Sequence, residues 1–258
     1  MGAREEQADS QDGPGATDPV SAGPTVGTGP GASDQAGLRS IDGVPFVCSW
    51  SGGKDSALAL HHAIAAGGRP RALLTMMIED GTRSRSHGLP RGVLEAQAAA
   101  LGIPLHTRSA SWDDYEQRFG AALAEQRADG VRAGVFGDID VERNLAWVQR
   151  MCAAADVRAC EPLWHRPRRE LLDELLALGF RTRMVAVNAE LLPADLLGRV
   201  LDHHLVAELE AAGVDASGEL GEYHTVVEDG PPFRTPVPLA FGEVVTRSGY
   251  HVVDTRTA

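Results

Sequence analysis

Lysine is almost absent from this sequence. Of its 24 basic residues only Lys54 is a lysine, and the rest are arginines. Arginine carries a planar fork and lysine a compact point charge, so a tight pocket for an anion can accept one and refuse the other. Because Lys54 follows a Gly-Gly pair, we interpret it as the basic group of such a pocket.

Three further shortages limit the class of protein. Aromatic residues make up 5% of the chain, so the core must be built from alanine, leucine and valine. No stretch approaches the roughly 20 apolar residues of a membrane helix, and the beginning of the sequence lacks the pattern of a signal peptide. Cys48, Cys152 and Cys160 include no C-x-x-C pair, which argues against a zinc site or a disulfide framework. We therefore expect a cytoplasmic protein with no membrane partner.

The chain is acidic, with a formal net charge of −12. Nucleic-acid binding needs basic surface that displaces counterions, so we expect no nucleic-acid partner. Residues 1–42 are rich in Gly, Ala, Pro, Asp, Ser and Thr. Such a segment buries too little apolar surface to offset the entropy of ordering it, which predicts a disordered acidic tail.

From residue 43 onward, apolar runs alternate with segments of helical spacing. The predicted strands span 44–50, 72–78, 105–109, 131–136, 157–162 and 181–187. The predicted helices span 55–66, 93–101, 115–128, 142–155 and 167–178. This alternation predicts an α/β domain over residues 43–187 with a parallel sheet covered on both faces. Such sheets bind ligands beyond the carboxyl ends of their strands.

The pattern changes after Val187. Residues 193–212 have helical spacing, and a Gly/Pro-rich stretch follows, with strand-like runs at 225–228 and 243–247. We interpret residues 188–247 as a smaller C-terminal α+β lobe that holds the substrate. Residues 248–258 are interpreted as a C-terminal tail.

The first predicted strand runs into a loop suited to binding phosphate. The loop residues are Ser51, Gly52, Gly53, Lys54, Asp55 and Ser56. Two glycines let the backbone turn tightly and approach an anion. The helix that follows directs unpaired N–H groups and its positive dipole end toward that anion. The two serines can donate hydroxyl hydrogen bonds, and Asp55 is expected as an N-cap or first-turn acid.

The loop and several later segments resemble known families. Ser-Gly-Gly-Lys-Asp-Ser after the first strand is the signature of the PP-loop ATP pyrophosphatases, whose nucleotide-binding domain is Rossmann-like (adenine nucleotide alpha hydrolase-like). Within that superfamily the chain resembles the diphthine–ammonia ligase family. The segments that carry this resemblance are 86–88, 95–97 with 101–105, 136–139, 161–164 and 218–225. The resemblance implies an ATP-dependent ligase that adenylates a carboxylate, releases pyrophosphate and forms an amide with ammonium.

Mg²⁺ is the second cofactor implied beside ATP. Asp138 lies just past the fourth predicted strand, at the same edge of the sheet as the loop, and oxygen ligands suit Mg²⁺. Asp138 also matches the acidic position of the family's Gly-Asp-Ile segment, so we interpret it as a metal or substrate ligand. Asp140 fits better as an N-cap of the helix at 142–155, and we leave it outside the site.

The segment at 218–225 supplies the remaining candidates. Glu219 and Glu222 bracket a Gly-rich turn, and the resemblance implies that they hold ammonium and take its proton. His224 and Thr225 follow directly and are expected to contact substrate. His87, in a polar loop after the second strand, is expected near the nucleotide. Where bacterial relatives are expected to have Pro-Cys before this segment, the chain has Ala216-Ser217, so the resemblance does not extend to the substrate side of the pocket.

Other functions stay open from the sequence alone. The ligase reading requires a small-molecule or protein-borne carboxylate and free ammonium, because no glutaminase domain is recognisable. The Ala-, Arg- and Gly-rich composition is typical of a GC-rich bacterium, which disfavours diphthine itself as the acceptor. One alternative is a PP-loop enzyme that acts on a tRNA base, and another is a sensor that binds adenine nucleotide without turnover. Each of these three interpretations is compatible with a homodimer.

Overall fold

The folded core begins slightly earlier than the sequence predicts. The computed structural model describes residues 40–258, so residues 1–39 of the predicted acidic tail lie outside the described residues. Ile41, which the prediction placed in that tail, is fully buried and packs in the main core. Burying an isoleucine side chain stabilises a fold by about 1.5–3 kcal/mol, enough to fix this segment.

The first half of the described chain forms the predicted parallel sheet. Its strands are β1 (Pro45–Ser49), β2 (Arg69–Met77), β3 (Leu105–Ser109), β4 (Ala133–Val135) and β5 (Arg158–Cys160). All four pairings are parallel, and the strand order is β3-β2-β1-β4-β5. The order reverses beside β1, and ligands of such sheets bind at that point of reversal. The α/β fold class is confirmed.

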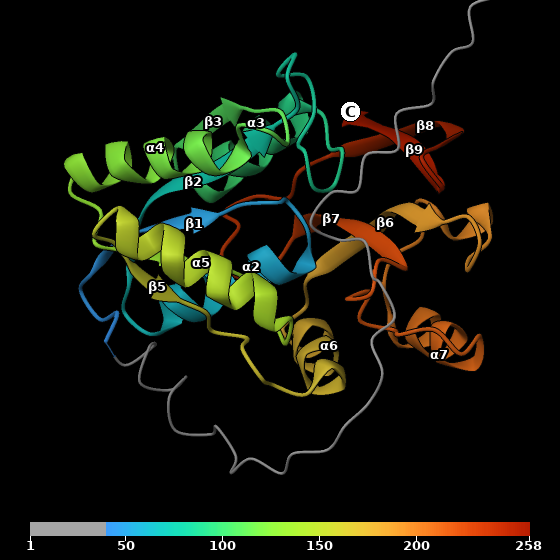
Figure 1. Cartoon of the computed structure of the whole chain (residues 1–258). Coiled ribbons are helices and arrows are strands. Elements are labelled where there is room, and N and C mark those ends of the chain that lie inside the picture. Colours follow the sequence, from blue (N-terminus) through green and yellow to red (C-terminus); the bar gives the residue numbers. More distant parts are fainter. Residues whose placement is uncertain (1–39) are drawn as a thin grey trace, which may run out of the picture.

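Helices cover both faces of this sheet (Figure 1). One face contacts α2 (Lys54–Ala65) and α3 (Arg91–Leu101), and the other contacts α4 (Tyr115–Ala128) and α5 (Glu142–Ala154). The helix α6 (Arg168–Ala177) belongs to the same core as α2. Successive side chains of a strand point to opposite faces of the sheet. Because helices cover both faces here, consecutive residues of a central strand can all be buried. In β1, Phe46 and Cys48 join the first core and Val47 joins the second.

The second half forms an antiparallel sheet that corrects two predictions. Its strands are β6 (Arg181–Asn188), β7 (Tyr223–Asp229), β8 (Leu239–Arg247) and β9 (Tyr250–Thr257), in the order β7-β6-β9-β8. The strand expected at 181–187 exists as β6, but it pairs with β7 and β9 and not with the parallel sheet. The expected tail at 248–258 contains β9, an inner strand that hydrogen-bonds on both edges.

The helical region of the C-terminal lobe is shorter than predicted. Residues 193–212 hold a one-turn 3₁₀ helix, η1 (Ala194–Leu196), and the helix α7 (His203–Ala211). Asp202 caps α7 by accepting a hydrogen bond from Leu205 N. A side chain that caps a helix in this way fixes its start, which explains why the helix begins at 203. No helix within residues 40–258 is long and apolar enough to cross a membrane.

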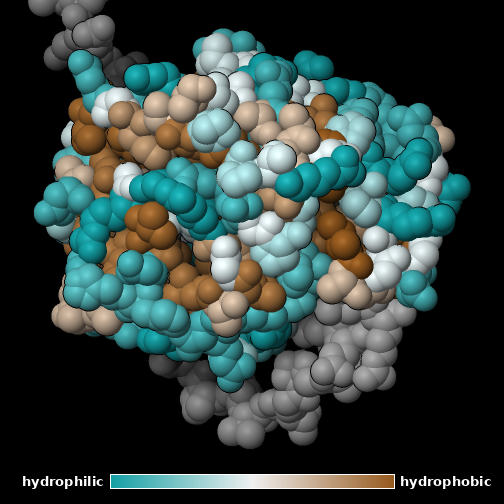
Figure 2. Space-filling view, turned by 180° about the vertical axis from the view of Figure 1, so that it is seen from behind, coloured by the Kyte–Doolittle hydropathy of each residue, from teal (hydrophilic) through white to brown (hydrophobic). Residues whose placement is uncertain are grey.

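The two sheets share one hydrophobic core. Buried residues of β6, β7 and β9, including Met184, Val226 and Val253, pack in the same cluster as Phe46 and Leu58. The outer edge of β7 also meets the loop after β1, where Val227 N donates a 2.9 Å hydrogen bond to Gly52 O. Figure 2 shows the reverse side of the molecule, where apolar residues lie in patches between polar ones. The hydrogen bond between Val227 and Gly52 places the C-terminal sheet against the predicted phosphate loop.

Candidate active site at the loop after β1

Both glycines of the loop are required by what surrounds them. Gly52 has φ +82°, in the left-handed region, and a Cβ there would lie 2.7 Å from both Gln97 Oε1 and Leu89 Cδ1. A Cβ on Gly53 would overlap the His87 ring. A left-handed conformation favours glycine, and a backbone this closely covered has no room for a side chain. The tight turn predicted from the sequence is thus present.

The start of α2 lacks a side-chain cap. Its N-cap is Gly53, which has no side chain to satisfy the first N–H groups of the helix. Asp55, expected as an N-cap or first-turn acid, lies in the first turn. Unpaired N–H groups and the dipole at a helix N-terminus attract negative charge, as phosphate-binding loops do. The helix start therefore suits phosphate oxygens.

Hydroxyl groups from both lobes order the turn. Ser51 Oγ lies 3.1 Å from Ser56 Oγ and accepts a 3.3 Å hydrogen bond from Gly53 N. Ser56 Oγ donates to Gly53 O at 3.0 Å. Thr225 Oγ1, from β7, accepts a 3.1 Å hydrogen bond from Lys54 N. The predicted substrate residue Thr225 thus contacts the phosphate loop directly.

Lys54 lies almost fully buried between two carboxylates. Its Nζ is 2.7 Å and 2.8 Å from the two oxygens of Asp55 and 3.5 Å from Glu219 Oε1. Burial alone would lower the pKa of Lys54, but Asp55 and Glu219 outweigh it and raise that pKa. Burial and the neighbouring Asp55 raise the pKa of Glu219, while Lys54 opposes the rise. Lys54 is therefore positively charged at neutral pH.

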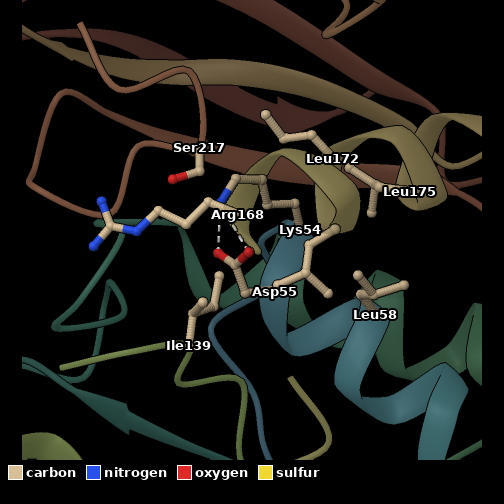
Figure 3. A pocket seen from close by; sticks show the side chains of 9 residues that line it. Lys54, Asp55, Leu58, Ile139, Arg168, Leu172, Leu175 and Ser217 are labelled. Atoms are coloured by element: carbon tan, nitrogen blue, oxygen red, sulfur yellow. Dashed lines mark hydrogen bonds and ion pairs between the residues drawn. The ribbon is translucent and has the colours of Figure 1, made fainter. Parts of the chain in front are cut away.

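The space beside Lys54 is narrow. Figure 3 shows the Lys54 ammonium directed at the Asp55 carboxylate, with leucines of α2 and α6 closing one side. The lining residues are Lys54, Asp55, Leu58, Ile139, Arg168, Leu171, Leu172, Leu175 and Ser217. The free volume is about 10 Å³, enough for about one water molecule. A triphosphate can reach Lys54 only after the groups around it move.

Two histidines stack above the loop. The rings of His87 and His224 lie 4.7 Å apart, and His224 also stacks on Tyr250 at 5.6 Å. His87 Nδ1 is 3.1 Å from Thr225 O. Burial is the main cause that lowers the pKa of His87 to about 4 and that of His224 to about 3, and the charge of Lys54 adds to both shifts. Both rings are neutral at neutral pH, which suits contact with a nucleotide or acceptor.

Asp138, the predicted metal or substrate ligand, is partly buried beside Asn144 and near Asp55. Its Oδ1 accepts a 3.0 Å hydrogen bond from Asn144 Nδ2. Burial and the nearby Asp55 raise the pKa of Asp138, which is what a second carboxylate close by produces. Residues 40–258 contain no group of three or more acids, histidines or cysteines arranged for a metal. One or two carboxylates fit Mg²⁺, which usually completes its shell with water and phosphate oxygens.

The two predicted glutamates have different surroundings. Glu219 reaches Lys54, as described above. Glu222 is buried, and its Oε2 accepts a 2.9 Å hydrogen bond from Leu220 N. A carboxylate that accepts from the backbone two residues away stabilises its own turn. The structure therefore brings Glu219 to the loop and gives Glu222 a contact that holds the 218–222 turn.

Sequence reasoning missed three residues around the site. Asp140 was expected to cap α5, but the N-cap is Val141, and both Asp140 oxygens lie 2.7 Å from the Arg168 guanidinium. Arg168 also pairs with Asp215, whose carboxylate accepts from Ser217 Oγ at 2.8 Å. The third is Gln97, fully buried under the loop. Only its place in the 95–97 segment pointed to Gln97, and these long-range pairings leave no trace in residue spacing.

A Gly-Gly-Lys turn that joins the central strand of a parallel sheet to a glycine-capped helix N-terminus is typical of nucleotide-binding proteins of the PP-loop ATP pyrophosphatase type. Two family models match the chain, the diphthamide synthase N-terminal domain over residues 46–159 and the diphthamide synthase C-terminal domain over residues 167–253. The chain belongs to this family of PP-loop diphthine–ammonia ligases. That membership identifies it as an ATP-dependent carbon–nitrogen ligase.

Individual relatives agree with this assignment. The diphthine–ammonia ligase of Danio rerio is 26% identical over 226 residues, which cover 77% of this chain and 87% of the relative. The enzymes of Bos taurus and Homo sapiens are each 25% identical, covering 77% of this chain and 84% of theirs. A solved structure described as a predicted subunit of tRNA methyltransferase from Methanocaldococcus jannaschii is similar at 16% identity and a TM-score of 0.40, covering 71% of this chain and 96% of that one.

Proposed function

We propose that this protein adenylates a carboxylate with ATP, releases pyrophosphate, and transfers the acyl group to ammonium to form an amide. The observation that carries the proposal is the meeting of one buried lysine, a helix N-terminus without a side-chain cap, and Glu219 at a single turn. The first two groups suit a leaving pyrophosphate, and the third suits a cationic nitrogen donor. A phosphate pocket and an ammonium base thus lie side by side.

The pyrophosphate half of the reaction needs the Lys54 charge to be released from its partners. Asp55 holds the Lys54 ammonium and Thr225 holds the Lys54 amide in this structure. Phosphate oxygens can replace both acceptors, because they offer the same ammonium and amide a more negative partner. Lys54 and the N-terminus of α2 then neutralise the charge that develops as the bond between the α-phosphorus and the bridging oxygen breaks.

Mg²⁺ would be held by Asp138, with Asp55 nearby, and when bound it would neutralise charge on the phosphate oxygens. Asn144 orients the Asp138 carboxylate through its 3.0 Å hydrogen bond. An oriented carboxylate binds a hard cation with less loss of entropy than a free one. Asn144 is therefore a supporting residue of the proposed metal ligand.

The amide-forming half uses Glu219. Ammonium pairs with the Glu219 carboxylate and gives it one proton, and the resulting ammonia attacks the acyl carbon of the adenylate. The carbon–nitrogen bond forms as the carbon–oxygen bond to AMP breaks, AMP leaves with the bonding electrons, and the nitrogen loses its extra proton to solvent. A general base works best when its pKa lies near the working pH, and burial raises the pKa of Glu219 in that direction.

The acceptor is the open part of the proposal. The relatives at about 25% identity are diphthine–ammonia ligases, so the carboxylate of diphthine on elongation factor 2 is the first acceptor to test. Ala216-Ser217 lies at the substrate side, where Ser217 is buried and bonded to Asp215. A different carboxylate from a bacterial metabolite pool is the second acceptor to test.

One experiment tests this function. The full chain is incubated with ATP, Mg²⁺, ¹⁵N-ammonium and either diphthine-bearing elongation factor 2 or a metabolite pool, and pyrophosphate release is followed. We expect release that depends on both ammonium and acceptor, with ¹⁵N in an amide product by mass spectrometry. The matched control is Lys54→Ala. Release that is unchanged in this variant would contradict the proposal.

Three expectations stay predictions. Association as a homodimer is checked by light scattering coupled to size-exclusion chromatography. The cytoplasmic location is checked by fractionation of the source cells. Action on a tRNA base is disfavoured by the acidic charge of the chain, and strongly salt-dependent tRNA binding would revive it.

A further inference from the structure

Gln97 of α3 is the most fully engaged side chain beneath the loop. It is completely buried, and its amide makes three hydrogen bonds to residues 45, 47 and 130 positions away. Trp50 Nε1 donates to Gln97 Oε1 at 3.0 Å. Gln97 Nε2 donates to Gly52 O at 2.9 Å and to Val227 O at 2.8 Å. One amide therefore joins the end of β1, the loop and β7.

The orientation of this amide is forced by its partners. The indole nitrogen of Trp50 is only a donor, and the two backbone carbonyls are only acceptors. In a flipped amide, Nε2 would face the Trp50 N–H, donor against donor, and Oε1 would face the two carbonyl oxygens, acceptor against acceptor. Trp50 thus fixes Gln97, and Gln97 can donate only to Gly52 and Val227.

The carbonyl of Gly52 is held from two sides. It accepts from Gln97 Nε2 and also from Val227 N at 2.9 Å. The peptide plane that carries this carbonyl also carries the Gly53 N–H on its other side. Fixing the Gly52 carbonyl therefore also fixes the Gly53 N–H, which donates to Ser51 Oγ at 3.3 Å in this structure, one residue before Lys54.

We infer that Gln97 is a positioning residue that holds the phosphate loop and the edge of β7 in one arrangement, so that the backbone of the turn already has its phosphate-binding shape before ATP binds. The inference rests on the proposed ATP site. Without the Gln97 donors, Val227 N alone would hold the Gly52 carbonyl, and the peptide could rotate. MgATP affinity would then fall without loss of the fold.

The chain offers a matched control on the other face of the sheet. Gln126 of α4 is also a buried glutamine, and its Nε2 lies 3.2 Å from His106 Nδ1, away from the loop. Gln126→Leu removes a comparable buried amide without touching the site. Gln97→Glu keeps the shape of Gln97 but replaces its donor with oxygen. Trp50→Phe removes the indole N–H that orients Gln97, together with part of a fully buried ring, and leaves both Gln97 donors in place.

The experiment measures the dissociation constant of MgATP by isothermal titration calorimetry and the melting temperature of each variant. We expect Gln97→Glu and Gln97→Leu to weaken MgATP binding at least about tenfold and Trp50→Phe to weaken it about threefold, while Gln126→Leu lowers the melting temperature and leaves affinity within twofold. If the Gln97 variants fail to fold, Trp50→Phe decides the outcome.

Two results separate the possible failures. Wild-type protein that binds no MgATP would contradict the proposed function. Wild-type binding with unchanged affinity in Gln97→Glu, or in a folded Trp50→Phe variant, would overturn the positioning role of Gln97 alone and leave the proposed function intact.

Discussion

The backbone amide of Lys54 donates a 3.1 Å hydrogen bond to the side chain of Thr225, 171 residues further along the chain. This contact joins the first residue of α2 to the edge strand of the C-terminal sheet. The amide it occupies is one that a phosphate oxygen would use. In the proposed site, a bound nucleotide and Thr225 of the C-terminal sheet therefore compete for this N–H group.

Thr225→Val tests that link. The substitution keeps the shape of the side chain but leaves the Lys54 amide without its acceptor, which costs about 1–3 kcal/mol for a buried group. We expect a lower melting temperature in the absence of ligand. Saturating MgATP should narrow the gap to wild type, because a phosphate oxygen satisfies the amide. A gap that stays the same with and without MgATP would show that the two acceptors do not share this amide.

Substitutions of Lys54 test the need for a compact charge. The Lys54 ammonium lies against Asp55 and Glu219 with only about 10 Å³ of free space beside it, which is too little for the larger guanidinium fork. We expect both Lys54→Arg and Lys54→Met to lower kcat for pyrophosphate release by about 10²–10³, as removal of one preorganised donor typically does. The measurement is a coupled pyrophosphate assay. Near wild-type activity of Lys54→Arg would show that charge alone suffices.

The two glutamates of the 218–222 turn should respond differently. Glu219→Gln removes the carboxylate beside Lys54, and we expect ammonium KM to rise at least about tenfold. Glu222→Gln retains an oxygen that can accept from Leu220 N, so its effect on ammonium KM should stay within about threefold. Steady-state kinetics with varied ammonium decides between them. Equal effects of both substitutions would contradict the assignment of Glu219 as the base.

The stacked histidines make stability depend on pH. Their pKa values in the folded state, about 4 for His87 and about 3 for His224, lie below the unfolded value, so the unfolded chain binds more protons in acid. The contribution of the two neutral histidines to the free energy of unfolding is fully present above a pH of about 6.5 and is lost as the pH falls toward 4. We expect His87→Asn to reduce the loss of unfolding free energy between pH 7.5 and 5.0 by about 1–2 kcal/mol. An unchanged pH dependence in denaturant titrations would show that His87 is charged in the folded protein.

The sequence predicts those elements of the fold that are determined by their own residues and not by the strand that pairs with them. The strand before Ser51 and the helix after it follow from an apolar run, two glycines and helical spacing, and the structure confirms both. The apolar run at 181–187 predicts a buried strand, but it fits either sheet, because the pattern of apolar residues does not indicate which strand pairs with it. The final strand, β9, was missed because its residues alternate weakly and gain their order only by pairing with β6 and β8.

The candidate site shows the same division. Lys54 was found because it is the only lysine in the chain and lies in a glycine turn. The roles of Gln97 and Arg168 were not predicted, because their partners lie far away in sequence and a glutamine or arginine on a helix usually faces solvent. Contacts across 45 to 130 residues depend on how the two sheets pack, and residue spacing carries no record of that.

The central claim is that ATP is cleaved between its α- and β-phosphates at the loop after β1. The most direct test is ³¹P NMR of ATP incubated with the full chain, Mg²⁺, ammonium and an accepted carboxylate. The account predicts AMP and pyrophosphate in equal amounts, and neither product with Lys54→Ala. Formation of ADP and inorganic phosphate would contradict it.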